Sequence, residues 1–186
     1  KIGERIMSEI RLREPSYVDD PEINDYLAML GGRLVEASGN PTGDFHFFAI
    51  RDNTVNAFAM YGGFIGVNTG TLLTAQSESE LASVIAHEIA HVTQNHLARQ
   101  LAREKLNTVP SMVAMALGLL AARSNSSVAA ATVASTQAGM VQAQLAYTRD
   151  FEREADRVGY QTLDKAGFDV RGMGDFFERL QKAGRL

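Results

Sequence analysis

The feature that most constrains this chain is the pentapeptide His87-Glu88-Ile89-Ala90-His91. Two histidines four residues apart, with a glutamate directly after the first, form the H-E-x-x-H pattern. On a helix, residues i and i+4 share a face, so both imidazoles can reach one metal ion, at about 2.0–2.1 Å for zinc. Glu88 is rotated by about 100° from His87, close enough to touch a metal-bound water without ligating the metal. The pattern therefore predicts a metal site, and the alternative is a chance match in an ordinary helix.

The residues around the pentapeptide favour a helix. Ser77 followed by Glu80 is typical of an N-terminal capping box. We expect the helix to run past Arg99 to about residue 106. Apolar residues recur at the three- and four-residue spacing of a buried face, at Leu81, Val84, Ile85, Ile89 and Val92.

Composition is that of an ordinary globular domain. The chain has 186 residues, of which 45% are hydrophobic and 22% charged, so we predict a single domain over residues 1–186. The net charge of −4 shows no basic excess, and we expect no nucleic-acid partner. The absence of cysteine excludes disulfides and thiolate zinc sites. Because no signal peptide is visible and the chain starts at Lys1, we expect a fragment or a processed form.

The remaining pattern mixes helices with short strands. It predicts an α+β fold, mostly helical, with a small three-stranded sheet beside the H-E-x-x-H helix. Gly62-Gly63 indicates a tight hairpin. Further helices are expected at 2–13, 21–38, 150–166 and 170–185, a short helix or turn at 69–75, and strands at 45–51, 55–61 and 64–67.

One strand is unusually small and weakly amphipathic, at Asn56, Ala57, Phe58 and Ala59. Such a strand can leave its edge open, so that an extended peptide adds to the sheet. An ordinary packed strand is an equal alternative.

Residues 109–147 are largely apolar or uncharged. Residues 109–122 are too few to span a bilayer, which takes about 20 apolar residues, and 126–147 contain Ser, Thr and Gln throughout. We therefore predict no stable membrane span. The segment is expected to form lid helices over the metal site, and plain core helices are the alternative.

A catalytic zinc keeps three protein ligands and one open position. His96 is disfavoured as the third, because it falls on the opposite side of the helix from His87. Glu152, Glu154 and Asp156 offer carboxylates instead. Glu152 and Asp156 share a helix face, so one can bind metal while the other accepts the N–H of a ligating histidine. The alternative is a solvated charged helix face.

The motif, together with the downstream stretch Tyr147-Thr148-Arg149-Asp150-Phe151-Glu152-Arg153-Glu154-Ala155-Asp156-Arg157-Val158-Gly159, resembles the gluzincin metallopeptidase family of HtpX, BepA and the type I CAAX prenyl protease. The chain is most similar to the soluble, periplasmic BepA-like branch. Residues 56–59 and Gly62-Gly63 also resemble that family. The resemblance covers about residues 23–167 and implies a zincin-like domain.

The resemblance also assigns roles. It implies one Zn²⁺ per chain, bound by His87, His91 and Glu152. Asp156 would support a ligating histidine, and Glu88 would be the general base of peptide hydrolysis. For a second oxyanion donor besides zinc, the candidates are Tyr147, Arg149 and Tyr160.

The expected function is that of a zinc-dependent endopeptidase acting on misfolded or misassembled envelope proteins in the periplasm. Family resemblance adds the outer-membrane assembly machinery as a partner. BepA-like proteins continue into a tetratricopeptide-repeat domain, preceded by a histidine that can cover the zinc, and we expect both to be absent from this chain. One alternative is a chaperone-like quality-control module with a structural or latent zinc site. Another is a zinc hydrolase of non-peptide substrates.

Overall fold

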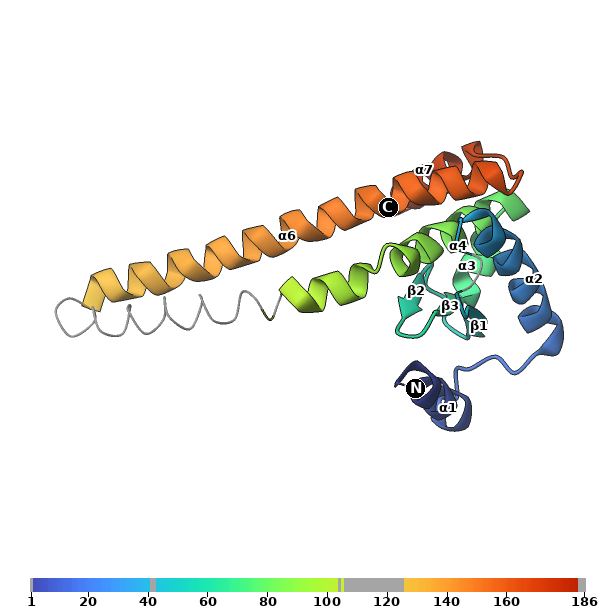
Figure 1. Ribbon diagram of the computed structural model, residues 1–186, viewed down its shortest axis with the longest axis horizontal. Coiled ribbons are helices and arrows are strands. Elements are labelled where there is room, and N and C mark those ends of the chain that lie inside the picture. Colours follow the sequence, from blue (N-terminus) through green and yellow to red (C-terminus); the bar gives the residue numbers. More distant parts are fainter. Residues whose placement is uncertain (1, 41–42, 104, 106–125, 184–186) are drawn as a thin grey trace. The chain divides into compact units, whose positions relative to one another are not determined.

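The computed structural model describes residues 2–40, 43–103, 105 and 126–183. The chain divides into two compact units, unit 1 with Lys1–Gln94 and Glu154–Leu186, and unit 2 with Asn95–Arg153. Helix α6 (Ser126–Lys165) contributes to both units, and residues 96–103 are helical in unit 2. The other elements lie in unit 1 (Figure 1): α1 (Ile2–Arg13), α2 (Pro21–Ala37), β1 (His46–Ile50), β2 (Ala57–Met60), β3 (Phe64–Asn68), α3 (Thr69–Thr74), α4 (Glu78–Thr93) and α7 (Arg171–Ala183).

Unit 1 is built around a three-stranded sheet with the order β1-β3-β2. The central strand β3 is wholly buried and pairs in parallel with β1 and antiparallel with β2. The turn between β2 and β3 uses Gly62 and Gly63, whose φ angles of 87° and 79° lie in the left-handed region that glycine favours. The predicted hairpin and small sheet are therefore confirmed.

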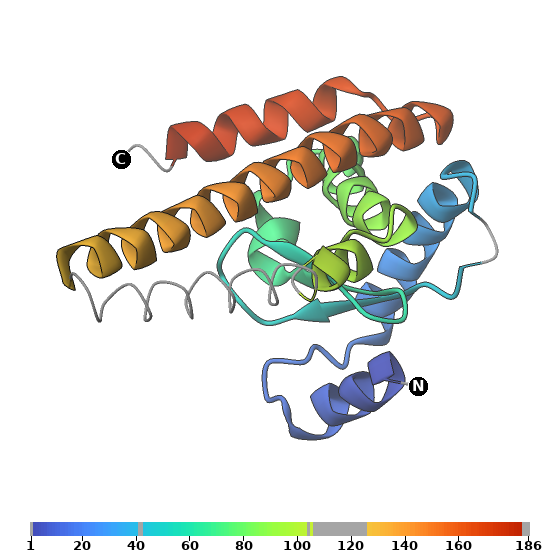
Figure 2. The same ribbon diagram turned by 60° about the vertical axis from the view of Figure 1, so that its left-hand side comes forward.

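Helices cover both faces of this sheet (Figures 1 and 2). On one face, α2 and α4 form the main core with side chains of β1 and β3. On the other face, Met7 of α1 packs with Phe48 and Phe64. Because successive strand residues point to opposite faces, Phe64 belongs to one core and its neighbour Ile65 to the other. This confirms the predicted α+β class, with the sheet beside the motif helix α4.

Helix α4 begins as the sequence predicts. The Ser77 hydroxyl oxygen accepts a 3.2 Å hydrogen bond from the Glu80 N–H. In a capping box the Glu80 carboxylate would accept the Ser77 N–H; here it accepts the N–H of the preceding residue, Gln76, at 2.6 Å. It also pairs with Arg179 of α7. The N-cap is confirmed, and Glu80 adds a tertiary contact that the capping pattern did not predict.

The end of α4 differs from the prediction. The helix ends at Thr93, and Asn95 has a φ of 54°, a left-handed conformation that asparagine adopts more readily than most residues. An α-helix cannot continue through a left-handed residue, so 96–103 form a separate helical stretch. The prediction of one helix to about residue 106 was therefore wrong.

Helix α6 begins at Ser126, well before the predicted start near residue 150. Residues 126–149 contain no proline and many alanines, so nothing in the sequence stops a helix there. The predicted lid at 109–147 lies largely outside the described residues. Residues 106–125 are not described at all, and the side chains of 126–140 are not described. No helix in the described part of the chain has the length and apolarity that crossing a membrane requires.

Candidate metal centre

Helix α4 presents the two motif histidines side by side. Their Nε2 atoms lie 3.0 Å apart, and both side chains are half-buried beside the core-facing stripe of the helix. Two ring nitrogens at this separation can converge on one ion, since zinc–nitrogen bonds are about 2.0–2.1 Å long. Glu88 follows His87 directly and is also half-buried.

Asp156 of α6 contacts the other ring nitrogen of His87. Its Oδ1 atom lies 2.9 Å from Nδ1, a hydrogen-bonding distance, although the ring N–H is not well aligned on that oxygen. A carboxylate at this nitrogen holds a ligating histidine in the tautomer and orientation that a metal requires. The distance supports the predicted role of Asp156, which stays a prediction.

Gly159 allows α6 to approach α4 closely at this point. A β-carbon at residue 159 would lie 3.1–3.2 Å from backbone atoms of Ala86 and His87. Asp156, about one turn earlier on α6, is thereby brought to His87. Our sequence reasoning assigned no role to Gly159. The available signal was a glycine inside a helical pattern, which often marks a close packing contact.

Glu152 lies one turn before Asp156 on the same uninterrupted helix. His87, His91 and Glu152 each offer one ligand atom, and these atoms all lie within 4.8 Å of one another. Two imidazole nitrogens and a carboxylate oxygen are the donor set of a catalytic zinc site that keeps one open position. The residues present therefore fit a metal ion such as zinc, and the roles of Glu152 as third ligand and of Asp156 beside His87 stay predictions.

Two candidate oxyanion donors share a face of α6 with these carboxylates. Arg149, Glu152, Asp156 and Tyr160 follow one another at three- or four-residue spacing, which keeps them on one side of a helix. Arg149 donates from Nε to the Leu145 carbonyl at 3.3 Å, and both candidates are exposed. Helix geometry therefore favours Arg149 and Tyr160 for this role.

An aromatic cluster in unit 2 holds the third candidate, Tyr147. Its ring packs against Phe151 with centroids 4.1 Å apart, and the Arg103 guanidinium lies over it at 4.0 Å. His96 is 3% exposed and stacks on Phe151 at 4.3 Å, while Arg99 lies over the same ring at 4.7 Å. These contacts give Tyr147 and His96 a packing role.

β2 is an edge strand of the described sheet, because it pairs with β3 alone. The side chains of Ala57 and Ala59 pack against the core that contains α4, and their small size lets the strand lie close to that helix. The Asn56 carbonyl accepts the Asn68 N–H, so alternate residues from Asn56 turn their backbone groups toward β3. Ala57 and Ala59 therefore turn their backbone groups toward the free edge.

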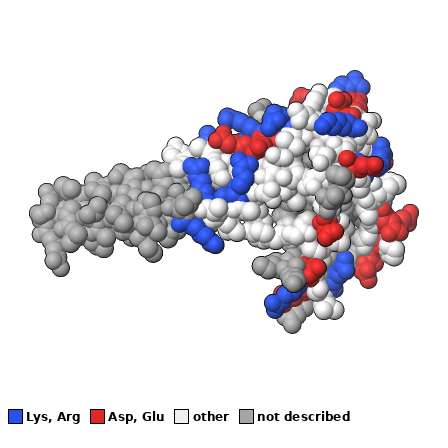
Figure 3. Space-filling view, viewed as in Figure 1, with Lys and Arg blue, Asp and Glu red and all other residues white. Residues whose placement is uncertain are grey.

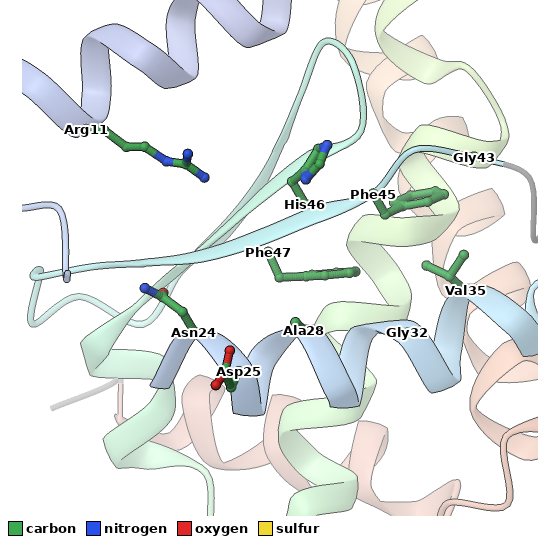
Figure 4. Close-up of a pocket in the computed structure, with 10 residues that line it drawn as sticks. All are labelled: Arg11, Asn24, Asp25, Ala28, Gly32, Val35, Gly43, Phe45, His46 and Phe47. Atoms are coloured by element: carbon green, nitrogen blue, oxygen red, sulfur yellow. The ribbon is translucent and has the colours of Figure 1, made fainter. Parts of the chain in front are cut away.

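Two hollows of unit 1 are lined by none of the candidate ligands. One, of about 380 Å³, lies among α1, α2 and β1; Figure 4 shows Arg11 reaching toward β1 and Phe47 lying over α2. His46 also lines it and stacks on Phe64 at 4.8 Å. The other, of about 740 Å³, is lined by residues of α2, α3 and α4. On the face in Figure 3, acidic and basic side chains of unit 1 are interspersed, without a broad field of one sign.

A valine at residue 159 tests the close approach of α6 to α4. Gly159→Val is expected to lower the free energy of unfolding by about 1–3 kcal/mol relative to Gly174→Val, because the side chain would overpack backbone atoms. Gly174 is the matched control, since a β-carbon there would meet nothing within 4 Å. Urea unfolding followed by circular dichroism measures both, and equal stabilities would contradict the packing role of Gly159.

Comparison with known proteins places the chain among metallopeptidases. Residues 21–184 match the family model described as Peptidase family M48. The beta-barrel assembly-enhancing protease of Escherichia coli K12 is 36% identical over 180 residues, which cover 97% of this chain. A Vibrio cholerae protein, whose name also refers to a beta-barrel assembly-enhancing protease, is 46% identical over 178 residues, or 96% of this chain. The chain spans 37% of the length of each.

A more distant relative comes from a eukaryote. The mitochondrial metalloendopeptidase OMA1 of Schizosaccharomyces pombe is 29% identical over 159 residues, which cover 85% of this chain and 44% of that protein. The similarity therefore extends across bacterial and mitochondrial metallopeptidases.

Proposed function

We propose that this chain, which belongs to peptidase family M48, a family of metallopeptidases, hydrolyses internal peptide bonds of proteins with a zinc ion. His87, His91 and Glu152 would hold that ion. The observation that carries the proposal is the gathering of one ligand atom from each of these residues within 4.8 Å. Metal chemistry follows from the family, and zinc is the metal that this donor set suits best.

The metal's contribution is to lower the pKa of a bound water and to polarise the scissile carbonyl. Glu88 would act as the general base, because the motif places its carboxylate directly after His87 on the same helix. It would accept the proton of the attacking water and deliver it to the amide nitrogen as the C–N bond breaks. Asp156, 2.9 Å from His87 Nδ1, would keep that ring in its ligating orientation.

The substrate would bind as an extended strand along β2. The backbone groups of Ala57 and Ala59 face the free edge, where a peptide can pair with them without dependence on its side chains. Such binding suits unfolded polypeptides, whose backbone is available for pairing. Arg149 or Tyr160, on the face of Glu152, would stabilise the oxyanion.

The bacterial relatives suggest the setting in which the chain acts. Their names refer to the assembly of β-barrels, so we infer that the substrates are misfolded or misassembled envelope proteins. The same inference places the protein in the periplasm, in contact with the outer-membrane assembly machinery. Membership of a peptidase family favours cleavage over the chaperone-like module that the sequence left as an alternative.

Metal removal tests the proposed chemistry. Treatment with a chelator is expected to abolish cleavage of casein, and stoichiometric zinc is expected to restore it, because hydrolysis needs the metal. Elemental analysis should find one zinc per chain. Cleavage that survives complete removal of the metal would reject the proposal.

Two substitutions on α6 refine this experiment. Glu152→Ala is expected to lower the zinc content, because it removes a ligand. Asp150→Ala is the matched control, since Asp150 lies on the same helix and pairs with exposed Arg153 at 3.5 Å. Equal zinc contents in the two variants would remove Glu152 from the ligand set.

A further inference from the structure

We propose that Thr71 of α3 is a positioning residue for the substrate strand. Its hydroxyl holds Asn56, and Asn56 in turn sets the direction in which Ala57 presents its backbone groups at the free edge of β2. The proposal rests on the proposed peptidase function and extends it to a residue outside the H-E-x-x-H motif.

The Thr71 hydroxyl makes two hydrogen bonds to one residue. Its oxygen accepts the Asn56 N–H at 2.8 Å, and its proton goes to the Asn56 carbonyl at 2.7 Å. The same carbonyl accepts the Asn68 N–H at 3.0 Å, which is the last rung of the hairpin ladder. Thr71 is completely buried, so water cannot readily replace its hydroxyl. Both backbone groups of Asn56 are thus held on the side away from the free edge.

The loop that leads into β2 is tied to the same turn of α3. Gly70 donates its N–H to the Asp52 carbonyl at 2.8 Å, and the Asp52 N–H donates to Thr69 Oγ1 at 3.1 Å. The Asn68 side chain adds a bond from Nδ2 to Thr54 Oγ1 at 3.0 Å. Helix α3 therefore serves as a clamp for the loop, with Thr71 as its buried contact at the strand itself.

Strand geometry connects this clamp to substrate binding. Backbone groups alternate in direction along a strand, so a change in the orientation of Asn56 turns the N–H and carbonyl of Ala57 as well. Ala57 also packs against the core that contains α4, so its position relative to the motif helix depends on the same anchor. Loss of the hydroxyl should thus weaken peptide pairing while the catalytic groups stay in place.

The test compares Thr71→Val, which removes the hydroxyl at nearly constant shape, with Thr71→Ser, which keeps it. The probe is a fluorescein-labelled octapeptide of alternating serine and valine, titrated by anisotropy against each variant in the inactive Glu88→Gln background. Thr71→Val is expected to raise the Kd about tenfold, the equivalent of one or two hydrogen bonds. In the active protein, KM should rise by a similar factor, with kcat within about twofold of its original value, and Thr71→Ser should restore both Kd and KM.

Two controls separate strand pairing from general damage. Thr162→Val removes another buried threonine hydroxyl, on α6, and should leave the Kd unchanged. An octapeptide N-methylated at alternate backbone positions should bind weakly and equally to the Thr71→Val variant and to the protein with Thr71. If the protein with Thr71 binds the unmodified peptide no tighter than the methylated one, the proposal is overturned.

An unchanged Kd in a folded Thr71→Val variant also overturns the proposal. If that variant does not fold, Thr54→Val on the exposed loop replaces it, with an expected rise in Kd of about threefold, because it removes the hydrogen bonds of the Thr54 hydroxyl with Asn68 Nδ2 and Asp52 Oδ1. An unchanged Kd in the Thr54→Val variant would also overturn the proposal. If peptide binding depends on Thr71 but casein is not cleaved, the peptidase function alone is rejected. If metal-dependent cleavage has the same KM with and without the Thr71 hydroxyl, this inference alone is rejected.

Discussion

Replacing Glu88 by glutamine is expected to abolish peptide cleavage while the protein stays folded and retains its metal. Glutamine has nearly the same shape as glutamate but cannot accept the proton of the attacking water. General-base catalysis contributes about 10²–10⁴-fold to such reactions, so the loss should be of that size. The measurement is kcat on a casein-derived peptide, with zinc content determined on the same preparation.

Glu78→Gln is the matched control for this substitution. Glu78 lies in the first turn of α4 and bonds Tyr26 and Arg33 on the surface, away from the motif. Cleavage by this variant should stay within about twofold of the original rate, since exposed ion pairs contribute little. Retained cleavage by Glu88→Gln, with zinc bound, would show that another group takes the proton.

The second large effect is expected at Glu80, which ties the start of α4 to α7. Its side chain is 6% exposed, and its carboxylate accepts hydrogen bonds from the Arg179 guanidinium, one of them at 2.9 Å. Glu80→Gln is expected to lower the free energy of unfolding by about 2–3 kcal/mol at pH 7, because it removes the charge from a buried, charge-assisted hydrogen bond. Urea denaturation followed by circular dichroism measures the change.

The ion pair of Glu80 and Arg179 also predicts that the free energy of unfolding depends on pH. Hydrogen bonding from Arg179 holds the pKa of Glu80 below its ordinary value, against the opposing effect of burial. A depressed pKa means that the folded state binds the proton less readily than the unfolded state. The stabilisation is therefore present at neutral pH and is lost as the pH falls below the ordinary glutamate range, about 4.3.

The original protein should consequently lose more stability between pH 7 and pH 3 than the Glu80→Gln variant does. Glu178→Gln supplies the control, since Glu178 pairs with Lys182 on the exposed side of α7. That variant should show no measurable change at pH 7. Parallel pH profiles for the original protein and Glu80→Gln would contradict the role of the pair.

Much of the architecture was predictable because the signals are local. Asp20 caps α2 by accepting the Glu22 N–H at 2.9 Å, and Pro21 occupies the first turn, as the sequence indicated. Gly62 and Gly63 identified the hairpin. The end of α4 was missed because its signal is a single asparagine at residue 95, whose helix propensity is low but not low enough to end a helix by itself.

The metal centre was also predictable only in part from local patterns. The spacing of His87 and His91 predicts that two imidazoles share a helix face, and the structure places their Nε2 atoms 3.0 Å apart. Spacing alone left Glu152 and Asp156 interchangeable as the third ligand. The contact of Asp156 with His87 Nδ1 favours Glu152 as the ligand, an assignment that stays a prediction, and this contact depends on how closely α6 packs on α4.

The motif helix and the hairpin were predictable from residue patterns alone, because helix periodicity, capping and turn chemistry act over a few residues. The same patterns supplied the histidine and carboxylate candidates for the metal site. Three contacts became apparent only in the folded chain: the buried bonds of Thr71 to Asn56, the pairing of Glu80 with Arg179 and the close approach at Gly159. These contacts join residues that lie far apart in the chain. Each depends on the packing of whole elements, which no local pattern of residue types specifies.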